Sequence, residues 1–146
     1  WTYIASMKPY GEESLARIAR HQAARAGKGF RTIERYEDIG GLTIQDRGTV
    51  LFECMCNLTA NELFDNAGMI RPAYDRILAG LAALEAQCAD LIVVTNDVGS
   101  DGSRYEEKTR LYVETLGRLN QALAQRYEVV AEMVCGIPIW LKGDPV

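Results

Sequence analysis

Asp90-Leu91-Ile92-Val93-Val94-Thr95 is the stretch of sequence that decides the fold. Its apolar residues follow one another without the polar–apolar alternation that marks a strand with one face in water. Thr49-Val50-Leu51-Phe52-Glu53-Cys54 shows the same pattern earlier in the chain. Both runs predict strands that are buried on both faces of a parallel sheet.

Helical patterns separate these strands. The segment from Glu12 to Ala26 has acidic residues in its first turn, where they suit the helix dipole, and glycines follow its end. Pro72 is expected in the first turn of a helix that runs to about Gln87. The other expected elements are extended segments at 2–6, 30–34, 129–135 and 137–141, and helices at 57–64 and 106–126. Strands alternating with helices predict an α/β fold, a mostly parallel sheet flanked by helices, in a single domain over residues 1–146.

Charge and cysteine content exclude several functions. The net charge of −4 argues against a nucleic-acid binder, which normally carries a basic stripe. The cysteines form no CxxC pair and one histidine cannot complete a zinc set, so we expect reduced core cysteines and no metal site among the protein's own ligands. No apolar run approaches the ~20 residues that cross a bilayer, and no basic-then-apolar leader opens the sequence. We therefore expect a cytoplasmic protein without a transmembrane segment. The cysteines are Cys54, Cys56, Cys88 and Cys135.

Polar residues follow the predicted strands where parallel sheets bind ligands, beyond the carboxyl ends. These places are Ser6 to Lys8, Glu53 and the residues after it, and Asn96 to Asp101. Carboxylates such as Glu34 and Glu53 could accept hydrogen bonds from ribose hydroxyls or help to hold magnesium. A solvated acid at a strand end is an equal alternative for Glu34. It is a weaker one for Glu53, which closes a strongly apolar strand.

The single histidine, His21, lies on a helix among arginines. Arg17, His21 and Arg25 are four residues apart and share a helical face, and Arg20 lies beside them. Arginines in this arrangement favour a neutral, nucleophilic imidazole and can bind phosphate. The alternative is a surface or packing histidine, which spacing alone does not exclude.

Five segments, in order, resemble the adenosylcobinamide kinase / adenosylcobinamide-phosphate guanylyltransferase family, and the likeness runs from about Tyr3 to Lys142. The segments are Arg17-Ile18-x-x-His21, Phe30-Arg31-Thr32-Ile33-Glu34, Val94-Thr95-Asn96-Asp97-Val98-Gly99, Leu116-Gly117-Arg118-Leu119-Asn120-Gln121-x-Leu123-Ala124 and Gly136-Ile137-Pro138-Ile139-x-Leu141-Lys142. Each is weak alone, and their shared order makes the resemblance specific. It implies a P-loop NTPase fold of the RecA-like type.

The resemblance implies a bifunctional enzyme of cobalamin biosynthesis. The family phosphorylates adenosylcobinamide and then transfers GMP from GTP to adenosylcobinamide phosphate through a guanylyl-histidine. His21 matches that histidine. Cofactors would be GTP, ATP and Mg²⁺, and a homo-oligomer, with a trimer favoured, would be the assembly. The implied nucleotide-binding residues are Ala5, Ser6, Met7, Gln22, Ala23, Ala24, Arg25, Glu34 and Glu53, with Arg17 and Arg20 as possible phosphate contacts.

Two departures keep alternatives open. The family begins with a strand and a GxxxxGKS/T phosphate loop, and no such string occurs in this sequence. We expect the natural protein to carry that segment before Trp1. Asp97 also stands where many members carry glutamate. The alternatives are a nucleotide- or corrinoid-binding domain without catalysis, and a guanylyltransferase without kinase activity.

Overall fold

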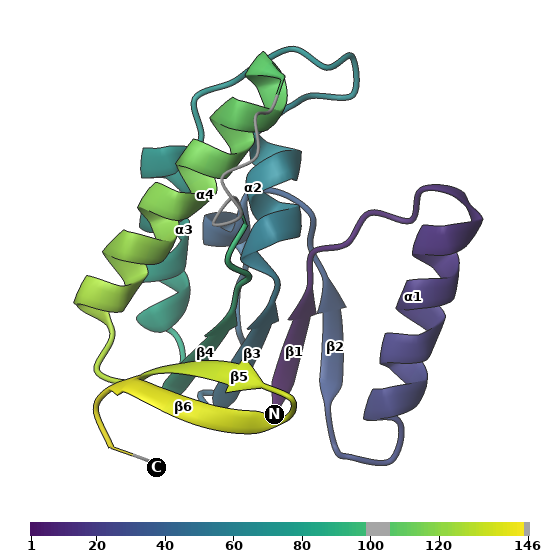
Figure 1. Cartoon of the computed structure of the whole chain (residues 1–146). Helices are drawn as coiled ribbons and strands as arrows, with labels where there is room; N and C mark the ends of the chain where they lie inside the picture. Colours follow the sequence, from purple (N-terminus) through teal and green to yellow (C-terminus); the bar gives the residue numbers. More distant parts are fainter. Residues whose placement is uncertain (99–105, 145–146) are drawn as a thin grey trace.

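A sheet of four parallel strands organises the molecule. The computed structural model describes residues 1–98 and 106–144, and its main sheet has the order β2-β1-β3-β4. The pairings β1–β2, β1–β3 and β3–β4 are all parallel (Figure 1). The strands are β1 (Thr2–Ala5), β2 (Arg31–Glu34), β3 (Thr49–Glu53) and β4 (Asp90–Val94). The predicted α/β fold with a mostly parallel sheet is confirmed.

Helices connect the strands where the sequence predicted them, with ends shifted by one or two residues. One prediction was wrong: Pro72 precedes its helix instead of occupying the first turn, because the helix begins at Tyr74 with Ala73 as its N-cap. In Figure 1, α1 stands beside β2, apart from α2, α3 and α4. The helical elements are α1 (Gly11–Arg25), η1 (Ile39–Gly41), α2 (Met55–Leu63), α3 (Tyr74–Glu85) and α4 (Glu107–Arg126).

The hydrophobic core lies between one face of the sheet and the helices α2, α3 and α4. Ile4 of β1 and Val50 and Phe52 of β3 point into it and are fully buried. Complete burial of such a side chain contributes about 1.5–3 kcal/mol to folding. The helices supply Met55, Leu58, Ile77, Leu81, Leu84, Leu116 and Leu119, all nearly inaccessible to solvent. This side of the sheet is therefore rigid.

The opposite face of the sheet is less covered than the sequence predicted. Along Thr49–Glu53 every second residue is only partly buried, so the strand is not buried on both faces. Ile92 of β4 is 43% exposed, because β4 is the edge strand of this sheet. Side chains on this face lie outside the core, and they form the candidate functional site.

The last two strands are β5 (Val130–Val134) and β6 (Ile137–Lys142), where the sequence predicted extended segments. They pair as an antiparallel hairpin, which the sequence analysis did not predict. Cys135 lies in its turn with φ 50°, and it is exposed. The expectation of four core cysteines is therefore wrong for this residue. Among the described residues no helix combines the length and the apolar character that crossing a membrane would need.

Candidate functional site

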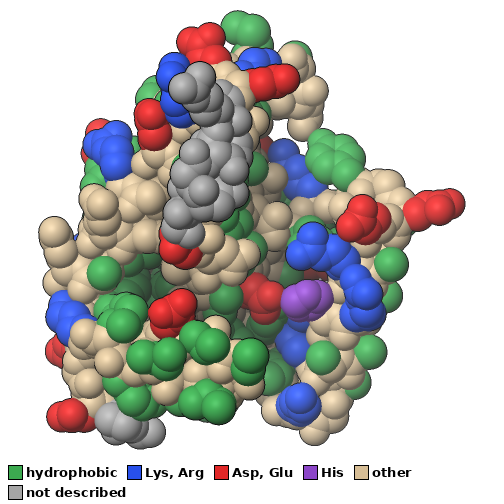
Figure 2. Space-filling view, in the orientation of Figure 1, with side chains coloured by type: hydrophobic (Ala, Val, Ile, Leu, Met, Phe, Trp, Pro, Cys, Tyr) green, Lys and Arg blue, Asp and Glu red, His purple; other side chains and the backbone are tan. Residues whose placement is uncertain are grey.

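A cleft between α1 and the open face of the sheet brings together half of the predicted site residues. We call it the α1 cleft, and in Figure 2 its purple histidine lies beside a red carboxylate, with blue cations nearby. The cleft opens near the carboxyl ends of β1, β2 and β3, where the topology of parallel sheets places ligand sites. It is lined by Tyr3, Ala5, Met7, Ile18, His21, Arg25, Glu34, Glu53 and Asn57.

His21 faces a carboxylate across the α1 cleft. Its Nδ1 atom lies 3.3 Å from Oε1 of Glu53, and their side chains are 43% and 28% exposed. A carboxylate at this nitrogen favours the tautomer with the proton on Nδ1, which leaves a lone pair on Nε2. The sequence had suggested arginines as the charges beside His21. The contact that the structure shows is instead with Glu53.

The strand register brings two carboxylates to either side of β1. Ala5 is paired in register with Glu34 of β2 and with Glu53 of β3. Because alanine is small, the space between the two carboxylates stays open. Glu34 is exposed, and its Oε2 accepts a hydrogen bond from the Tyr36 hydroxyl at 3.3 Å. The two acids can therefore approach one ligand from neighbouring strands.

Arg25 follows His21 by one helical turn and is the arginine of α1 that lines the cleft. Its guanidinium lies over the ring of Tyr3, 3.7 Å from the ring centroid. The Nε atom of Arg25 is buried without a hydrogen-bond partner among the described residues. A planar cation held flat against an aromatic ring can offer its edge to a phosphate.

The remaining predicted residues of α1 lie outside the cleft. Arg17 and Arg20 are exposed, and Ile18 is the residue of that turn which points inward. The three residues after His21 are exposed as well. They are Gln22, Ala23 and Ala24.

Ser6 was predicted to line the site, but its side chain does not line the α1 cleft. Its side chain is fully buried. The hydroxyl lies 3.1 Å from the carbonyl oxygen of Glu53 and 2.9 Å from that of Cys54, and it accepts the Cys54 N–H at 2.8 Å. Ser6 thus joins the end of β1 to the end of β3 and holds the backbone of Glu53 in place. Met7, the next residue, does line the cleft.

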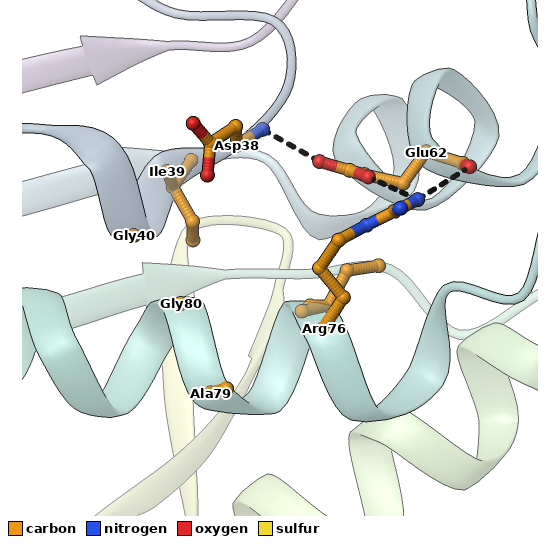
Figure 3. A pocket seen from close by; sticks show the side chains of 8 residues that line it. Asp38, Ile39, Gly40, Glu62, Arg76, Ala79 and Gly80 are labelled. Atoms are coloured by element: carbon orange, nitrogen blue, oxygen red, sulfur yellow. Dashed lines mark hydrogen bonds and ion pairs between the residues drawn. The ribbon is translucent and has the colours of Figure 1, made fainter.

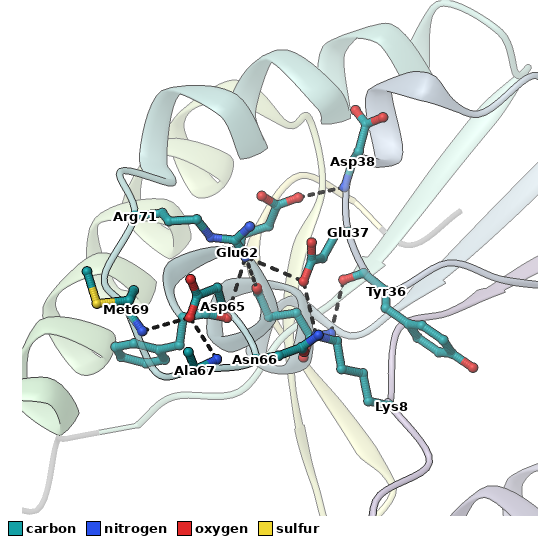
Figure 4. Close-up of polar contacts among 12 residues, drawn as sticks. Lys8, Tyr36, Glu37, Asp38, Glu62, Asp65, Asn66, Ala67, Met69 and Arg71 are labelled. Carbon is teal, nitrogen blue, oxygen red and sulfur yellow. Dashed lines mark hydrogen bonds and ion pairs between the residues drawn. The ribbon is translucent and has the colours of Figure 1, made fainter.

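Lys8, the last residue of that segment, belongs to a polar network beyond the strands (Figure 4). Its Nζ atom donates to Oε1 of Glu37 at 3.0 Å, and Arg71 reaches the same oxygen at 3.4 Å. Burial raises the pKa of Glu37, but the hydrogen bonds and charges of Lys8 and Arg71 outweigh it, so the pKa lies below its usual value. This network ties the loops after β1 and β2 to α2 and leaves Lys8 already paired.

A second pocket lies between η1 and α3, and polar contacts in it hold the neighbouring elements together (Figure 3). Glu62 within it is 4% exposed, and both of its oxygens are occupied. Oε1 accepts the backbone N–H of Asp38 at 2.6 Å, and Oε2 pairs with Arg76 at 2.7 Å. Gly40 and Gly80 let η1 and α3 approach, since a Cβ at Gly40 would lie 3.2 Å from the Cα of Gly80.

Two thiols stand directly after Glu53, at the start of α2. A hydrogen bond from Cys54 lowers the pKa of Cys56 to about 6, against the effect of burial. The same bond, together with burial, raises the pKa of Cys54. Asn57, which lines the cleft, donates its amide to Cys54 Sγ at 3.2 Å.

The third predicted segment, the loop after β4, is anchored to α4 by Asn120. Oδ1 of Asn120 lies 2.6 Å from Oγ1 of Thr95, and its amide donates to the carbonyl of Asn96 at 3.1 Å. Asn96 and Asp97 are exposed and do not line the α1 cleft. Asp101 lies outside the described residues.

Metal binding by the protein's own ligands finds no support in the described part of the chain. No group of three or more histidine, cysteine, aspartate or glutamate residues in it could hold a metal ion. The carboxylates that could touch a metal–nucleotide complex in the cleft are Glu34 and Glu53.

Sequence reasoning missed three residues of the cleft. Tyr3 and Ala5 lie two apart on one strand and so share a face, which means that the prediction of Ala5 already implied Tyr3. Ile18 lies three residues before His21 on the helix, and that spacing was an available signal too. Asn57 belongs to the segment after Glu53 that the sequence did predict to lie near a ligand, but nothing in the sequence singled it out within that segment.

Comparison with known proteins identifies the family of the chain. A family model described as cobinamide kinase / cobinamide phosphate guanyltransferase matches residues 1–141. The bifunctional adenosylcobalamin biosynthesis protein CobU of Escherichia coli is 31% identical, over 96% of this chain and 84% of the relative. CobU of Salmonella typhimurium is 30% identical over the same shares, and CobP of Pseudomonas aeruginosa is 30% identical over 99% of this chain and 84% of its own length. The chain belongs to the cobinamide kinase / cobinamide phosphate guanyltransferase family.

Proposed function

We propose that this chain acts in cobalamin biosynthesis and transfers GMP from GTP to adenosylcobinamide phosphate, with His21 as the covalent carrier. The observation that supports this most is the 3.3 Å contact between His21 Nδ1 and Glu53 Oε1 in a cleft that also holds Arg25. A histidine whose Nδ1 faces a carboxylate presents Nε2 as a nucleophile. The relatives are named as bifunctional proteins of adenosylcobalamin biosynthesis, which supports this choice of pathway.

The first step forms the guanylyl-histidine. The lone pair of His21 Nε2 attacks the α-phosphorus of GTP, the bond from this phosphorus to the bridging oxygen breaks, and pyrophosphate leaves with that electron pair. Magnesium bound to the triphosphate would supply neutralisation of charge on the leaving pyrophosphate, and Glu34 and Glu53 are the cleft carboxylates that could contact it. The imidazole gains positive charge as the P–N bond forms. Glu53 faces Nδ1 and stabilises that charge.

The second step discharges the intermediate. A phosphate oxygen of adenosylcobinamide phosphate attacks the same phosphorus, the P–N bond breaks, and its electron pair returns to Nε2. The products are adenosylcobinamide-GDP and free His21. Arg25 would bind the α-phosphate in both steps, because its guanidinium lies one turn from His21 and is supported by the Tyr3 ring.

Glu34 has the position of a nucleoside contact. It is exposed at the mouth of the cleft, across β1 from Glu53. Its carboxylate can accept hydrogen bonds from ribose hydroxyls or from the N–H groups of guanine. If Glu34 contacts the guanine base, the site would select GTP over ATP.

Phosphorylation of adenosylcobinamide, with ATP or GTP as donor, is the other half of the proposal. It rests on the family alone, since these 146 residues contain no GxxxxGKS/T string. Kinase activity is therefore tested separately, by following phosphate transfer from γ-labelled nucleotide to adenosylcobinamide.

We also propose that the protein is a homo-oligomer, with a trimer favoured. The β5–β6 hairpin presents apolar side chains to solvent, including Met133, Ile137 and Leu141, which are 64%, 66% and 63% exposed. Apolar surface of this kind marks interaction sites. Sedimentation as a monomer at micromolar concentration would contradict this assignment.

The covalent step is tested by incubation with α-labelled GTP and magnesium. A phosphoramidate is labile in acid and stable in alkali, so the protein should carry label with that stability. His21→Ala should carry none, while Glu114→Gln, at an exposed position of α4, should label like the wild type. Label that persists in a folded His21→Ala protein would refute the assignment.

A further inference from the structure

Tyr3 is a buried titratable residue whose ring supports Arg25 but whose hydroxyl has no role in the chemistry proposed above. It is 4% exposed, and its hydroxyl donates a hydrogen bond to Oε2 of Glu53 at 2.5 Å. The other oxygen of that carboxylate, Oε1, is the one that lies 3.3 Å from Nδ1 of His21. One carboxylate therefore connects Tyr3 to His21, using a different oxygen for each.

We propose that Tyr3 is a positioning residue of the guanylyl transfer, which holds the Glu53 carboxylate so that His21 keeps its proton on Nδ1 and presents Nε2 to the α-phosphate. This inference rests on the proposed function of His21. Tyr3 does not touch the reacting atoms, and no bond to it forms or breaks. It keeps its proton throughout and acts only through Glu53.

The sheet gives Tyr3 a fixed place relative to Glu53. Glu53 is in register with Ala5 and Tyr3 is in register with Leu51, so the glutamate side chain reaches back along the neighbouring strand to the tyrosine. All four side chains lie on the same face, because they are two residues apart on each strand. The hydrogen bond is a contact between two rigid strands, not between loops.

The aromatic ring of Tyr3 is held from two directions. Phe30 meets it edge-on, with ring centroids 6.2 Å apart at 79°. The Arg25 guanidinium lies over its face at 3.7 Å. A ring enclosed in this way cannot swing, so its hydroxyl is a donor with a fixed position. A water molecule or a serine at the same point would not orient the carboxylate equally well.

The protonation state of Tyr3 suits this role. Burial, followed by the hydrogen bond to Glu53, raises the pKa of Tyr3 above its usual value. The hydroxyl therefore remains a donor over the whole range in which the enzyme could work, and it does not serve as a base. Without it, Glu53 would lose the donor that restrains one of its two oxygens.

A purely structural tyrosine is the competing explanation, and substitutions separate the two. Tyr3→Phe keeps the ring, its contact with Phe30 and the stack under Arg25, and removes only the hydroxyl. Tyr127→Phe is the matched control, because the Tyr127 hydroxyl is buried and has no hydrogen-bond partner among the described residues. Both changes delete one buried hydroxyl, and only the first deletes a bond to Glu53.

Two measurements test the role of Tyr3. At saturating α-labelled GTP, we expect Tyr3→Phe to slow single-turnover labelling of His21 by about 10- to 100-fold, with GTP affinity changed less than about threefold. Tyr127→Phe should label at the wild-type rate. Equal rates for Tyr3→Phe and the wild type, or a slower rate explained entirely by weaker GTP binding, would overturn the proposal.

The tautomer of His21 provides a readout without any reaction. The chain has one histidine, so ¹⁵N-histidine NMR reports His21 alone. We expect the Nδ1–H tautomer in the wild type and in Tyr127→Phe. Tyr3→Phe should shift the population toward Nε2–H, and Glu53→Gln should do the same if Tyr3→Phe folds poorly. An unchanged tautomer would overturn the positioning role even if His21 becomes labelled. A shifted tautomer in a protein that never takes up label would support the positioning role and count against the guanylyl transfer instead.

Discussion

Replacing Glu53 by glutamine tests the electrostatic core of the mechanism. The substitution keeps the size and shape of the side chain and removes its negative charge. In the proposed first step, positive charge develops on His21 while the P–N bond forms, and Glu53 is the carboxylate that faces it. The change should therefore slow the chemical step and leave the binding of GTP largely intact.

The size of the effect follows from the geometry. Two unit charges at 3.3 Å attract by about 1.3 kcal/mol in bulk water and by about 5 kcal/mol at an effective dielectric constant of about 20. The two side chains are 43% and 28% exposed, which places this pair between the limits. With about 2–3 kcal/mol of transition-state stabilisation removed, the labelling rate should fall by roughly 30- to 150-fold.

The assay is rapid-quench labelling with α-labelled GTP at saturating concentration, with GTP affinity measured by calorimetry in parallel. Glu114→Gln, an exposed glutamate on α4, is the matched control and should react like the wild type. A Glu53→Gln protein that labels within threefold of the wild type, with unchanged affinity, would refute the claim that this carboxylate stabilises the imidazole.

Three further substitutions and one chemical modification test the packing of the fold, the reactivity of Cys56 and the role of Arg25. Gly80→Ala should destabilise the protein by about 1–3 kcal/mol, because the new Cβ would lie 2.8 Å from Ile39 Cγ1. Gly117→Ala, which meets nothing within 4 Å on α4, should stabilise it by about 0.5–1 kcal/mol, and urea unfolding measures both. Alkylation of Cys56 by iodoacetamide, followed by peptide mapping, should reach half of its plateau rate near pH 6. The thiolate is the reactive form, and the pKa of this thiol is lowered to about 6. Reactivity only above pH 8 would contradict this. Arg25→Lys in a His21→Ala background should weaken GTP binding about tenfold, as measured by calorimetry, because lysine cannot reproduce the planar contact with phosphate. An unchanged affinity would exclude Arg25 from the phosphate site.

The parts of the fold that the sequence could predict are those with a local signal. The apolar run from Asp90 to Val94 and the helical pattern from Gly11 to Arg25 each specify their own conformation. The rule that parallel sheets bind ligands at strand ends then placed Glu34 and Glu53 together. The burial of β4 could not be predicted this way, because apolar composition does not show that a strand is at the edge of its sheet.

Several side-chain positions around the α1 cleft depend on tertiary contacts that local sequence does not specify. Ser6 is taken up by hydrogen bonds to residues 47 and 48 positions away, which no local pattern reveals. Arg17 shares a helical face with His21 by spacing, but Ile18 is the residue of that turn that enters the cleft. The bond from Tyr3 to Glu53 spans 50 positions and depends on the register of β1 against β3.

The central claim is that His21 carries GMP between two substrates, and a chase experiment tests it most directly. Protein labelled with α-labelled GTP is freed from nucleotide and then mixed with adenosylcobinamide phosphate. We expect label to leave His21 and to appear in adenosylcobinamide-GDP, at a rate that depends on the concentration of adenosylcobinamide phosphate. Label that stays on the protein, or that is released only as GMP, would contradict it.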